Sequence, residues 1–125
     1  MNGWPAGYQL IRLEEIDSTN CEARRLAEAG EAGPVWIMAR SQTAGRGRRG
    51  RAWLSAPGNL AATLLIRPAR QPCGQLSFAS ALAAADVAEH FAPTAPVTVK
   101  WPYDVLAVHG KMVGIARTAD VTKDE

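Results

Sequence analysis

The densest group of chemically active side chains lies between Gly45 and Arg51, where GRGRRGR places four arginines and three glycines in seven residues. Arginine carries a permanent charge on a planar fork that grips phosphate or carboxylate with two hydrogen bonds. Glycine lets backbone amides approach the same oxygens closely. The segment therefore predicts an anion-binding loop, although a solvated basic surface loop or an Arg/Gly nucleic-acid patch has the same composition.

The flanks of this run favour a loop that is set into a fold. Gln42 and Trp53 stand on either side of the arginines, and the apolar segment Val35–Ala39 precedes them. A segment of arginine and glycine has little to bury and little preference for helix or strand. We therefore expect a loop on a rigid scaffold that is mobile without ligand.

Two more polar groups lie far from this loop in the sequence. Asp17–Asn20 reads DSTN before a helix-like segment, and Asp104 and Lys111 lie around a predicted hairpin. DSTN has the residue types that cap helices, and Thr19 with Glu22 fits a capping box, so capping alone would explain this group. Lys111 could equally be a surface lysine of the hairpin, because a lysine in an apolar strand must reach solvent or a partner.

The elements that must position these groups can be predicted from apolar periodicity and from glycine and proline. We expect strands at Tyr8–Ile16, Val35–Ala39, Leu60–Ile66, Val97–Trp101, Asp104–Val108 and Lys111–Ala116, and helices at Asn20–Ala29 and Leu76–Phe91. The dipeptide His109-Gly110 predicts a tight hairpin turn between the last two strands.

The alanine-rich interior of the second helix favours close packing on a sheet through one apolar face. Near-helical spacing assigns that face to Leu76, Ala79, Ala83, Val87 and Phe91. His90, close to the end of this helix, is interpreted as a partner of the helix dipole rather than as a catalyst, because no nucleophile or ligand neighbours it in sequence.

The composition narrows the class of protein. A chain of 125 residues is expected to form a single domain, and its formal charge of +2 would become −2 without Arg46, Arg48, Arg49 and Arg51, since each contributes +1. Such a local charge argues against a general nucleic-acid or membrane binder. The two cysteines lack metal or redox spacing, and we see no signal peptide and no apolar run of ~18 residues, so we expect a reduced, cytoplasmic protein.

Four motifs in order resemble the catalytic domain of biotin protein ligases. They are DSTN (Asp17–Asn20), GRGRRGRAW (Gly45–Trp53), KWPYD (Lys100–Asp104) and GKMVGI (Gly110–Ile115). The likeness runs from about Tyr8 to Ile115 and implies an α/β (α+β) fold, a mixed β-sheet flanked by helices of the type shared with lipoate ligases and class II synthetases. It also implies a reaction in which biotin and ATP with Mg²⁺ give biotinyl-adenylate, and the biotinyl group passes to a lysine of a biotin carboxyl carrier domain.

The resemblance implies a role for each matched residue. Biotin would be contacted by Ser18, Thr19, Asn20, Gln42, Arg46, Gly47, Arg48 and Lys111. The adenylate would be contacted by Arg48, Arg51, Trp53 and Asp104, the catalytic residues would be Arg46, Arg48 and Lys111, and no residue would bind a metal directly. Attack of a carboxylate on a phosphoryl group brings two anions together, so fixed positive charge is what this reaction needs.

Two features differ from the family pattern. Tyr103 stands where the KWPND motif has asparagine, and the chain ends about ten residues after GKMVGI, where the family continues with further strands. The resemblance therefore implies a domain that is truncated at its C-terminus. We expect it to be weakly stable or self-associated through an exposed sheet edge, with activity absent or far below that of a full-length ligase. No DNA-binding segment precedes the domain, so we expect no binding to DNA. The lack of a long apolar run predicts that the chain does not bind a membrane either.

Three other functions remain open at this point. The chain could be an inactive remnant that binds only biotin or a partner. It could be a lipoate or octanoyl transferase, which the arginine motif disfavours. It could also be a nucleic-acid-binding module built on the arginine loop, but that run contains no aromatic residues and the rest of the chain offers no positive face.

Overall fold

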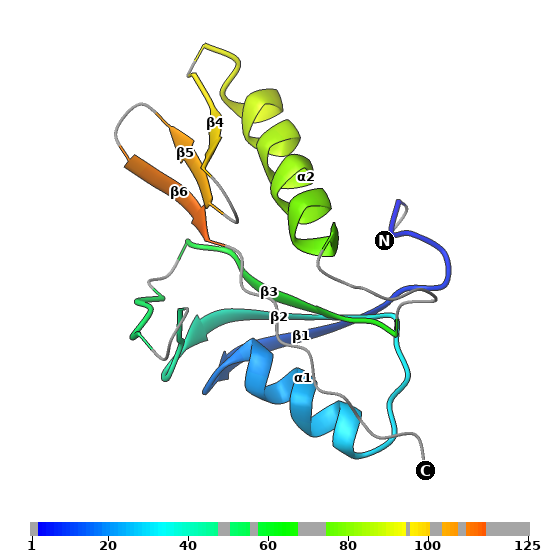
Figure 1. Ribbon diagram of the computed structural model, residues 1–125. Coiled ribbons are helices and arrows are strands. Elements are labelled where there is room, and N and C mark those ends of the chain that lie inside the picture. Colours follow the sequence, from blue (N-terminus) through cyan, green and yellow to red (C-terminus); the bar gives the residue numbers. More distant parts are fainter. Residues whose placement is uncertain are drawn as a thin grey trace. The chain divides into compact units, whose positions relative to one another are not determined.

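The computed structural model describes residues 3–47, 51–55, 58–67, 75–94, 96–100, 104–107 and 110–114 (Figure 1). Its elements are β1 (Gln9–Ile16), α1 (Thr19–Glu28), β2 (Val35–Gln42), β3 (Ala61–Leu65), α2 (Gln75–Phe91), β4 (Thr98–Lys100), β5 (Asp104–Ala107) and β6 (Gly110–Gly114). Each helix and strand that the sequence predicts is therefore present. The chain forms two compact units, one with β1 to β3 and α1 and one with α2 and β4 to β6. The single-domain interpretation stays a prediction.

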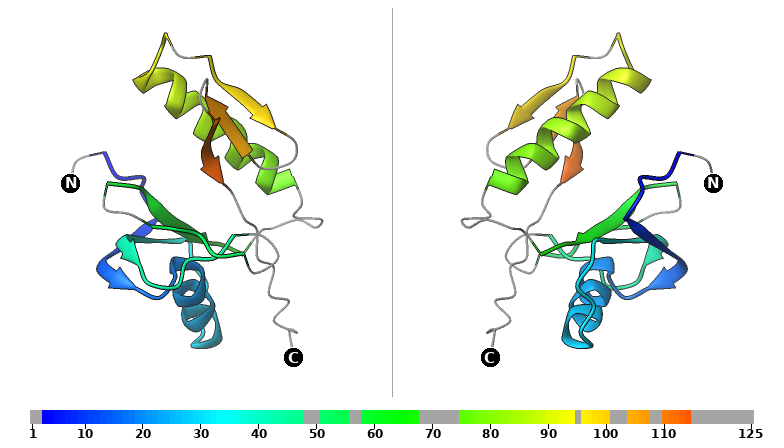
Figure 2. Two further views of the ribbon diagram at one scale, coloured as in Figure 1. Left: turned by 90° about the vertical axis from the view of Figure 1, so that its left-hand side faces the viewer. Right: turned by 90° about the vertical axis from the view of Figure 1, so that its right-hand side faces the viewer.

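The first unit is a three-stranded mixed sheet with one helix on it (Figures 1 and 2). Strands β1 and β2 are parallel, joined through α1, and β3 runs antiparallel to β2. Val35 and Ile37 alternate along β2 and are fully buried, and Ala23 of α1 packs against them. The short side chain of Ala23 lets α1 approach the sheet closely. Because side chains alternate between the two faces of a sheet, Val35 and Ile37 lie on the same face of β2, and α1 covers that face.

Helix α1 is capped at both ends by local sequence. Ser18 is the N-cap, and its hydroxyl accepts the backbone N–H of Cys21 at 3.3 Å. The predicted capping box of Thr19 with Glu22 is therefore wrong, because the helix begins one residue earlier. At the other end Gly30 has φ +96°, and its N–H and that of Glu31 donate to carbonyls of the last turn. This Schellman-type ending confirms Gly30 as the stop.

The arginine segment has strand-like ends. Arg46 and Ala52 form an antiparallel bridge, the Gly47 N–H donates to the Arg51 carbonyl at 2.6 Å, and the Trp53 N–H donates to the Gly45 carbonyl at 2.9 Å. The described residues of the segment belong to no named helix or strand, as expected, and the isolated bridge satisfies backbone groups at its two ends. The mobility of the segment stays a prediction, and residues 48–50 lie outside the described residues. We call Gly45–Trp53 the arginine hairpin.

The second unit is an antiparallel sheet in the order β4-β5-β6, with α2 against β4 and β5 (Figure 2). Val99 pairs with Val105, and Leu106 pairs with Lys111. The antiparallel pairing of β5 and β6 confirms the predicted hairpin. The predicted His109-Gly110 turn is wrong for Gly110, which pairs with Ala107 as the first residue of β6, and residues 108 and 109 lie outside the described residues.

The predicted packing face of α2 is wrong. The buried residues of this helix are Ala81 and Ala85, whereas Val87 is 58% and Phe91 80% exposed. The two faces lie on opposite sides of the helix, because Ala81 and Ala85 are a turn apart and about half a turn from the predicted stripe. Alanine allows the close approach to β4 and β5 that the larger side chains would prevent.

His90 lies in the last turn of α2, with its ring edge-on to Phe91 at a centroid distance of 5.1 Å. Its interaction with the helix dipole stays a prediction. No helix in the described part of the chain is both long and apolar enough to cross a membrane.

Candidate functional site

The polar residues of the first unit gather where β1 and β2 end. The parallel register pairs Ile16 with Gln42, so the two strands finish at the same edge of the sheet. Beyond it, the Thr43 N–H donates to the Ile16 carbonyl at 2.9 Å and the Ala44 N–H donates to the Asp17 carbonyl at 2.8 Å. The first turn of α1 and the start of the arginine hairpin therefore lie side by side.

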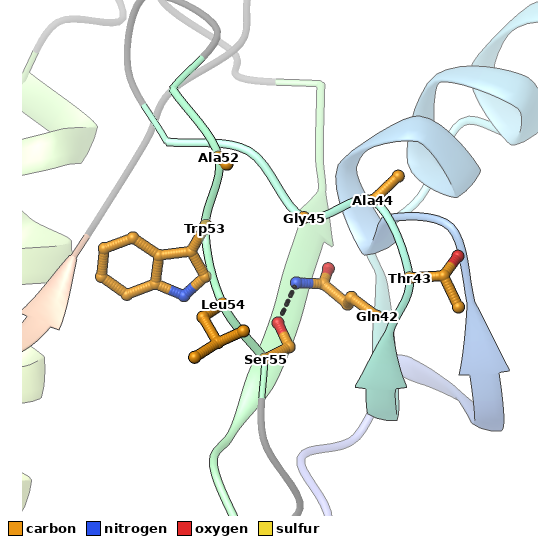
Figure 3. A pocket seen from close by; sticks show the side chains of 8 residues that line it. All are labelled: Gln42, Thr43, Ala44, Gly45, Ala52, Trp53, Leu54 and Ser55. Carbon is orange, nitrogen blue, oxygen red and sulfur yellow. Dashed lines mark hydrogen bonds between the residues drawn. The ribbon is translucent and has the colours of Figure 1, made fainter.

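Gln42 connects three segments through its side-chain amide. Its Oε1 accepts the Thr19 N–H at 2.8 Å and the Thr19 hydroxyl at 3.1 Å, and its Nε2 donates to Ser55 Oγ at 2.9 Å. Figure 3 shows Gln42 and Ser55 pointing toward each other. A backbone N–H can only donate, so the oxygen of Gln42 must face Thr19 and the nitrogen must face Ser55. Within the described residues one N–H of Gln42 remains for a ligand.

The first turn of α1 continues this network. Ser18 and Thr19 are only 5% and 4% exposed, and Asn20 is half-buried. Thr63 of β3 places its Oγ1 2.6 Å from Asn20 Oδ1 and 2.8 Å from Thr19 Oγ1. We call Thr19, Asn20, Gln42, Ser55 and Thr63 the polar cluster. Capping explains Ser18, but it does not explain why Thr19 and Asn20 bond to two strands.

A pocket of about 350 Å³ opens beside the polar cluster (Figure 3). It is lined by Gln42, Thr43, Ala44, Gly45, Ala52, Trp53, Leu54 and Ser55. Trp53 is 43% exposed. Its indole ring and the hydroxyl and amide groups of Ser55 and Gln42 give the pocket an aromatic surface and a polar one, which suits a ligand with both kinds of group.

Gly45 makes the close approach at the base of the arginine hairpin possible. A Cβ atom at this position would lie 2.8 Å from the Trp53 carbonyl oxygen and 2.9 Å from Gln42 Nε2. Both distances are too short for a carbon atom, and the first involves backbone that cannot rotate away. Glycine here thus keeps Gln42 against the returning strand of the hairpin.

An ion pair holds the carboxylate that precedes the helix. Arg25 donates from Nη2 to Asp17 Oδ1 at 2.7 Å and from Nη1 to Oδ2 at 3.0 Å, and it also bonds Glu22. These Arg25 bonds, together with the Ser18 N–H, lower the pKa of Asp17 to about 2, and the two carboxylates raise the pKa of Arg25. Arg25 thereby compensates the negative charge next to the residues expected to contact biotin.

The predicted site residues fall into three groups. Ser18, Thr19, Asn20 and Gln42 are brought together, and Gly45 to Gly47 and Arg51 to Trp53 form the adjoining hairpin, on which Arg46 and Arg51 are exposed. Arg48 and Tyr103 lie outside the described residues. Asp104 and Lys111 belong to β5 and β6, paired with Lys100 and Leu106, in the other unit. Among the described residues, no three His, Cys, Asp or Glu side chains are grouped to hold a metal ion.

Ser55 and Thr63 of the polar cluster could not be predicted from the sequence. Neither belongs to one of the four motifs, and each is an ordinary hydroxyl residue in its own segment. Their partners lie 13 and 43 residues away along the chain. No local pattern reports bonds of that kind, which appear only once the strands are paired.

Residues 13–124 match the Biotin/lipoate A/B protein ligase family. The chain is 48% identical over 106 residues to the biotin–[acetyl-CoA-carboxylase] ligase of Paracoccus denitrificans, and 39% identical over 121 residues to the protein of the same name from Mycobacterium tuberculosis. These alignments cover 82% and 91% of this chain and 44% of each relative. The chain therefore spans less than half the length of these curated relatives.

Solved structures agree with the sequence relatives. The biotin protein ligase from Aquifex aeolicus in complex with biotin and ATP superposes with a TM-score of 0.77 and 34% identity over 90% of this chain and 47% of that one. A biotin acetyl coenzyme A carboxylase synthetase from Helicobacter pylori superposes with a TM-score of 0.76 at 19% identity, which bears on the fold alone. Both confirm the predicted α+β fold.

Proposed function

This chain belongs to the biotin/lipoate A/B protein ligase family, and from that premise we propose that it activates biotin with ATP and transfers the biotinyl group to a carrier protein. The proposal is supported by the curated relatives, which are named biotin–[acetyl-CoA-carboxylase] ligases, and by the relative solved with biotin and ATP. The observation that carries it is the Gln42-centred polar cluster beside a pocket at the base of an arginine hairpin.

The polar cluster suits the ring system of biotin. That bicyclic ring carries a urea, whose carbonyl oxygen needs hydrogen-bond donors and whose faces are apolar. Asn20 Nδ2 and the second N–H of Gln42 Nε2 are donors without another partner among the described residues. Ser18 and Thr19 lie in the same turn, so we assign these four residues to the biotin ring.

The arginines suit the first chemical step. A carboxylate oxygen of biotin attacks the α-phosphorus of ATP, a C–O–P bond forms, and pyrophosphate leaves with the electrons of the broken P–O bond. Arg46, Arg48 and Lys111, by motif, are assigned to the negative charge that builds up there, with Mg²⁺ carried by the nucleotide. Loss of one such contact typically reduces the rate by about 10²-fold.

The second step is acyl transfer. The amine of a carrier lysine attacks the acyl carbon of biotinyl-adenylate, AMP leaves, and an amide bond forms. Gly47 is assigned to the biotin side, and Arg51, Trp53 and Asp104 to the adenylate side. An aromatic ring next to an adenine provides stacking area, and the Trp53 side chain is 43% exposed.

The experiment is a mass measurement on a biotin carboxyl carrier domain. The full chain is incubated with biotin, ATP, Mg²⁺ and the carrier domain, and we expect the carrier to gain the mass of one biotinyl group. A carrier whose acceptor lysine is replaced by arginine should gain nothing. Arg67→Ala changes an exposed arginine outside the motifs and should behave as wild type, whereas Arg46→Ala should be strongly impaired.

Measuring biotin binding and biotinyl-adenylate as well, and repeating the incubation with lipoate or octanoate, separates the alternatives. Biotin binding without biotinyl-adenylate or product would support the binding-only remnant. Transfer of a lipoyl or octanoyl group in place of biotin would support the transferase. Absence of both binding and transfer would overturn the proposed function.

A further inference from the structure

We propose that Thr63 is a positioning residue for the biotin-facing side of the site, an inference that rests on the proposed function. Nothing in the sequence motifs points to this threonine. It lies in the middle of β3, and its hydroxyl contacts two residues of the first turn of α1 that are assigned to biotin.

The sheet register explains how Thr63 reaches the helix. In the antiparallel pair of β2 and β3, Thr63 lies opposite Ile37. Directly opposed residues project from the same face of a sheet, and Ile37 is buried in the core with Ala23 of α1. Helix α1 also contacts β3. Thr63 therefore presents a hydroxyl to the helix at a position where the neighbouring strand presents an apolar side chain.

The distances indicate a tight contact. Thr63 Oγ1 is 2.6 Å from Asn20 Oδ1, at the short end of the range for hydroxyl donors, and 2.8 Å from Thr19 Oγ1. The backbone N–H of Thr19 in turn bonds Gln42, and Gln42 bonds Ser55. A series of hydrogen-bonded residues therefore runs from Thr63 through Thr19 and Gln42 to Ser55, next to the arginine hairpin.

The contact fixes what Asn20 can offer to a ligand. With Oδ1 engaged by Thr63, the amide nitrogen of Asn20 is directed away from β3 as a donor. A ligand group that meets it must then be an acceptor, such as the carbonyl oxygen of a urea. Because Asn20 is already held in this orientation, binding does not have to order it, and this lowers the entropic cost of binding.

A purely structural role of Thr63 predicts a different result. If the Thr63 hydroxyl only ties α1 to the sheet, its removal lowers stability without changing biotin affinity. If it positions Asn20, its removal weakens biotin binding in the folded protein. The variants must therefore be compared both by melting temperature and by affinity.

The test uses the full chain with Thr63→Val, which keeps the shape and removes the hydroxyl, and Thr63→Ser, which keeps the hydroxyl. Thr98→Val is the matched control, since Thr98 is an exposed strand residue. We expect Thr63→Val to raise the calorimetric Kd and the KM for biotin by about tenfold, while kcat for pyrophosphate release changes by less than about threefold. Thr63→Ser should stay within about threefold of wild type, and Thr98→Val should match it.

Each outcome decides the question. Wild-type affinity in Thr63→Val, or a defect of equal size in Thr63→Ser, would overturn the positioning role while leaving the proposed function intact. Failure of the wild-type chain to bind biotin would overturn the proposed function and this inference with it. Should Thr63→Val not fold, Thr63→Ala takes its place with the same expected rise in Kd.

Discussion

At the scale of single residues, the site depends on amide and hydroxyl groups whose partners follow from which atoms can donate and which can accept a hydrogen bond. Gln42 must turn its oxygen toward Thr19, because the Thr19 N–H can only donate and therefore needs an acceptor. Thr19 is 4% exposed, so that N–H could not turn to water instead. The residue expected from resemblance to bind ligand is therefore equally a structural bridge.

The first prediction concerns this bridge. Gln42→Met keeps the length of the side chain and leaves the Thr19 N–H and Ser55 without their partner. We expect the free energy of unfolding to fall by about 1–3 kcal/mol, the cost of a buried group left unsatisfied. Urea unfolding measures it, with Gln9→Met, an exposed position in β1, as the control that should change by less than about 0.5 kcal/mol. Equal effects in the two variants would contradict the bridge.

The second prediction concerns pH. The pKa of Asp17 is about 2 in the folded protein and 3.8 ordinarily, so its carboxylate stabilises the fold above pH ~4 and loses that contribution as the pH falls toward 2. In urea unfolding we expect Asp17→Asn to be less stable than wild type at pH 5, and this difference to shrink by pH 2. Because both partners are about half exposed, the difference should also decrease with salt. Asp86→Asn, on the exposed side of α2, is the control. An Asp17 carboxyl that titrates by NMR near pH 4 would contradict the ion pair.

At the scale of elements, the arginine hairpin combines a paired base with arginines that we assign to the proposed reaction. Its base is defined by the Arg46–Ala52 bridge and by Gly45, which packs against both the returning strand and Gln42. The strand ends, rather than the arginines, thus set where the hairpin leaves the sheet.

The third prediction compares two glycines of this hairpin. A Cβ at Gly45 would collide with the Trp53 carbonyl, whereas the nearest atom of the described residues to a Cβ at Gly47 is 3.7 Å away, an ordinary contact. We expect Gly45→Ala to lower the free energy of unfolding by about 1–3 kcal/mol. Gly47→Ala should stay within about 1 kcal/mol of wild type, because a compatible position tolerates alanine. Thermal or urea unfolding of both variants measures this, and equal destabilisation would show that the hairpin base is not packed as described.

At the scale of the whole molecule, ligand binding and folding are linked. A ligand that binds only the folded chain stabilises it by an amount set by its concentration relative to Kd. This gives a test of function that needs no catalytic turnover and uses the chain as it is.

The fourth prediction follows from that linkage. Biotin at about a hundred times its Kd should add about 2.7 kcal/mol of stability, which for a chain of this length is a rise in Tm of roughly 10 °C. The same concentration of lipoate should produce a smaller shift, and Thr63→Val should show a reduced shift with biotin. A Tm that is unchanged by biotin at millimolar concentration would contradict biotin binding.

The sequence by itself determined the elements and the family. Strand periodicity, glycine stops and capping residues act over a few positions, so each strand and helix was predictable, and the four motifs carried the resemblance. Local information could not choose between the two apolar faces of α2, because alanines and larger residues both repeat at helical spacing; only packing against β4 and β5 selected Ala81 and Ala85. Ser55 and Thr63 were likewise decided by tertiary structure, since hydrogen bonds between residues 13 and 43 positions apart exist only after β1, β2 and β3 have paired.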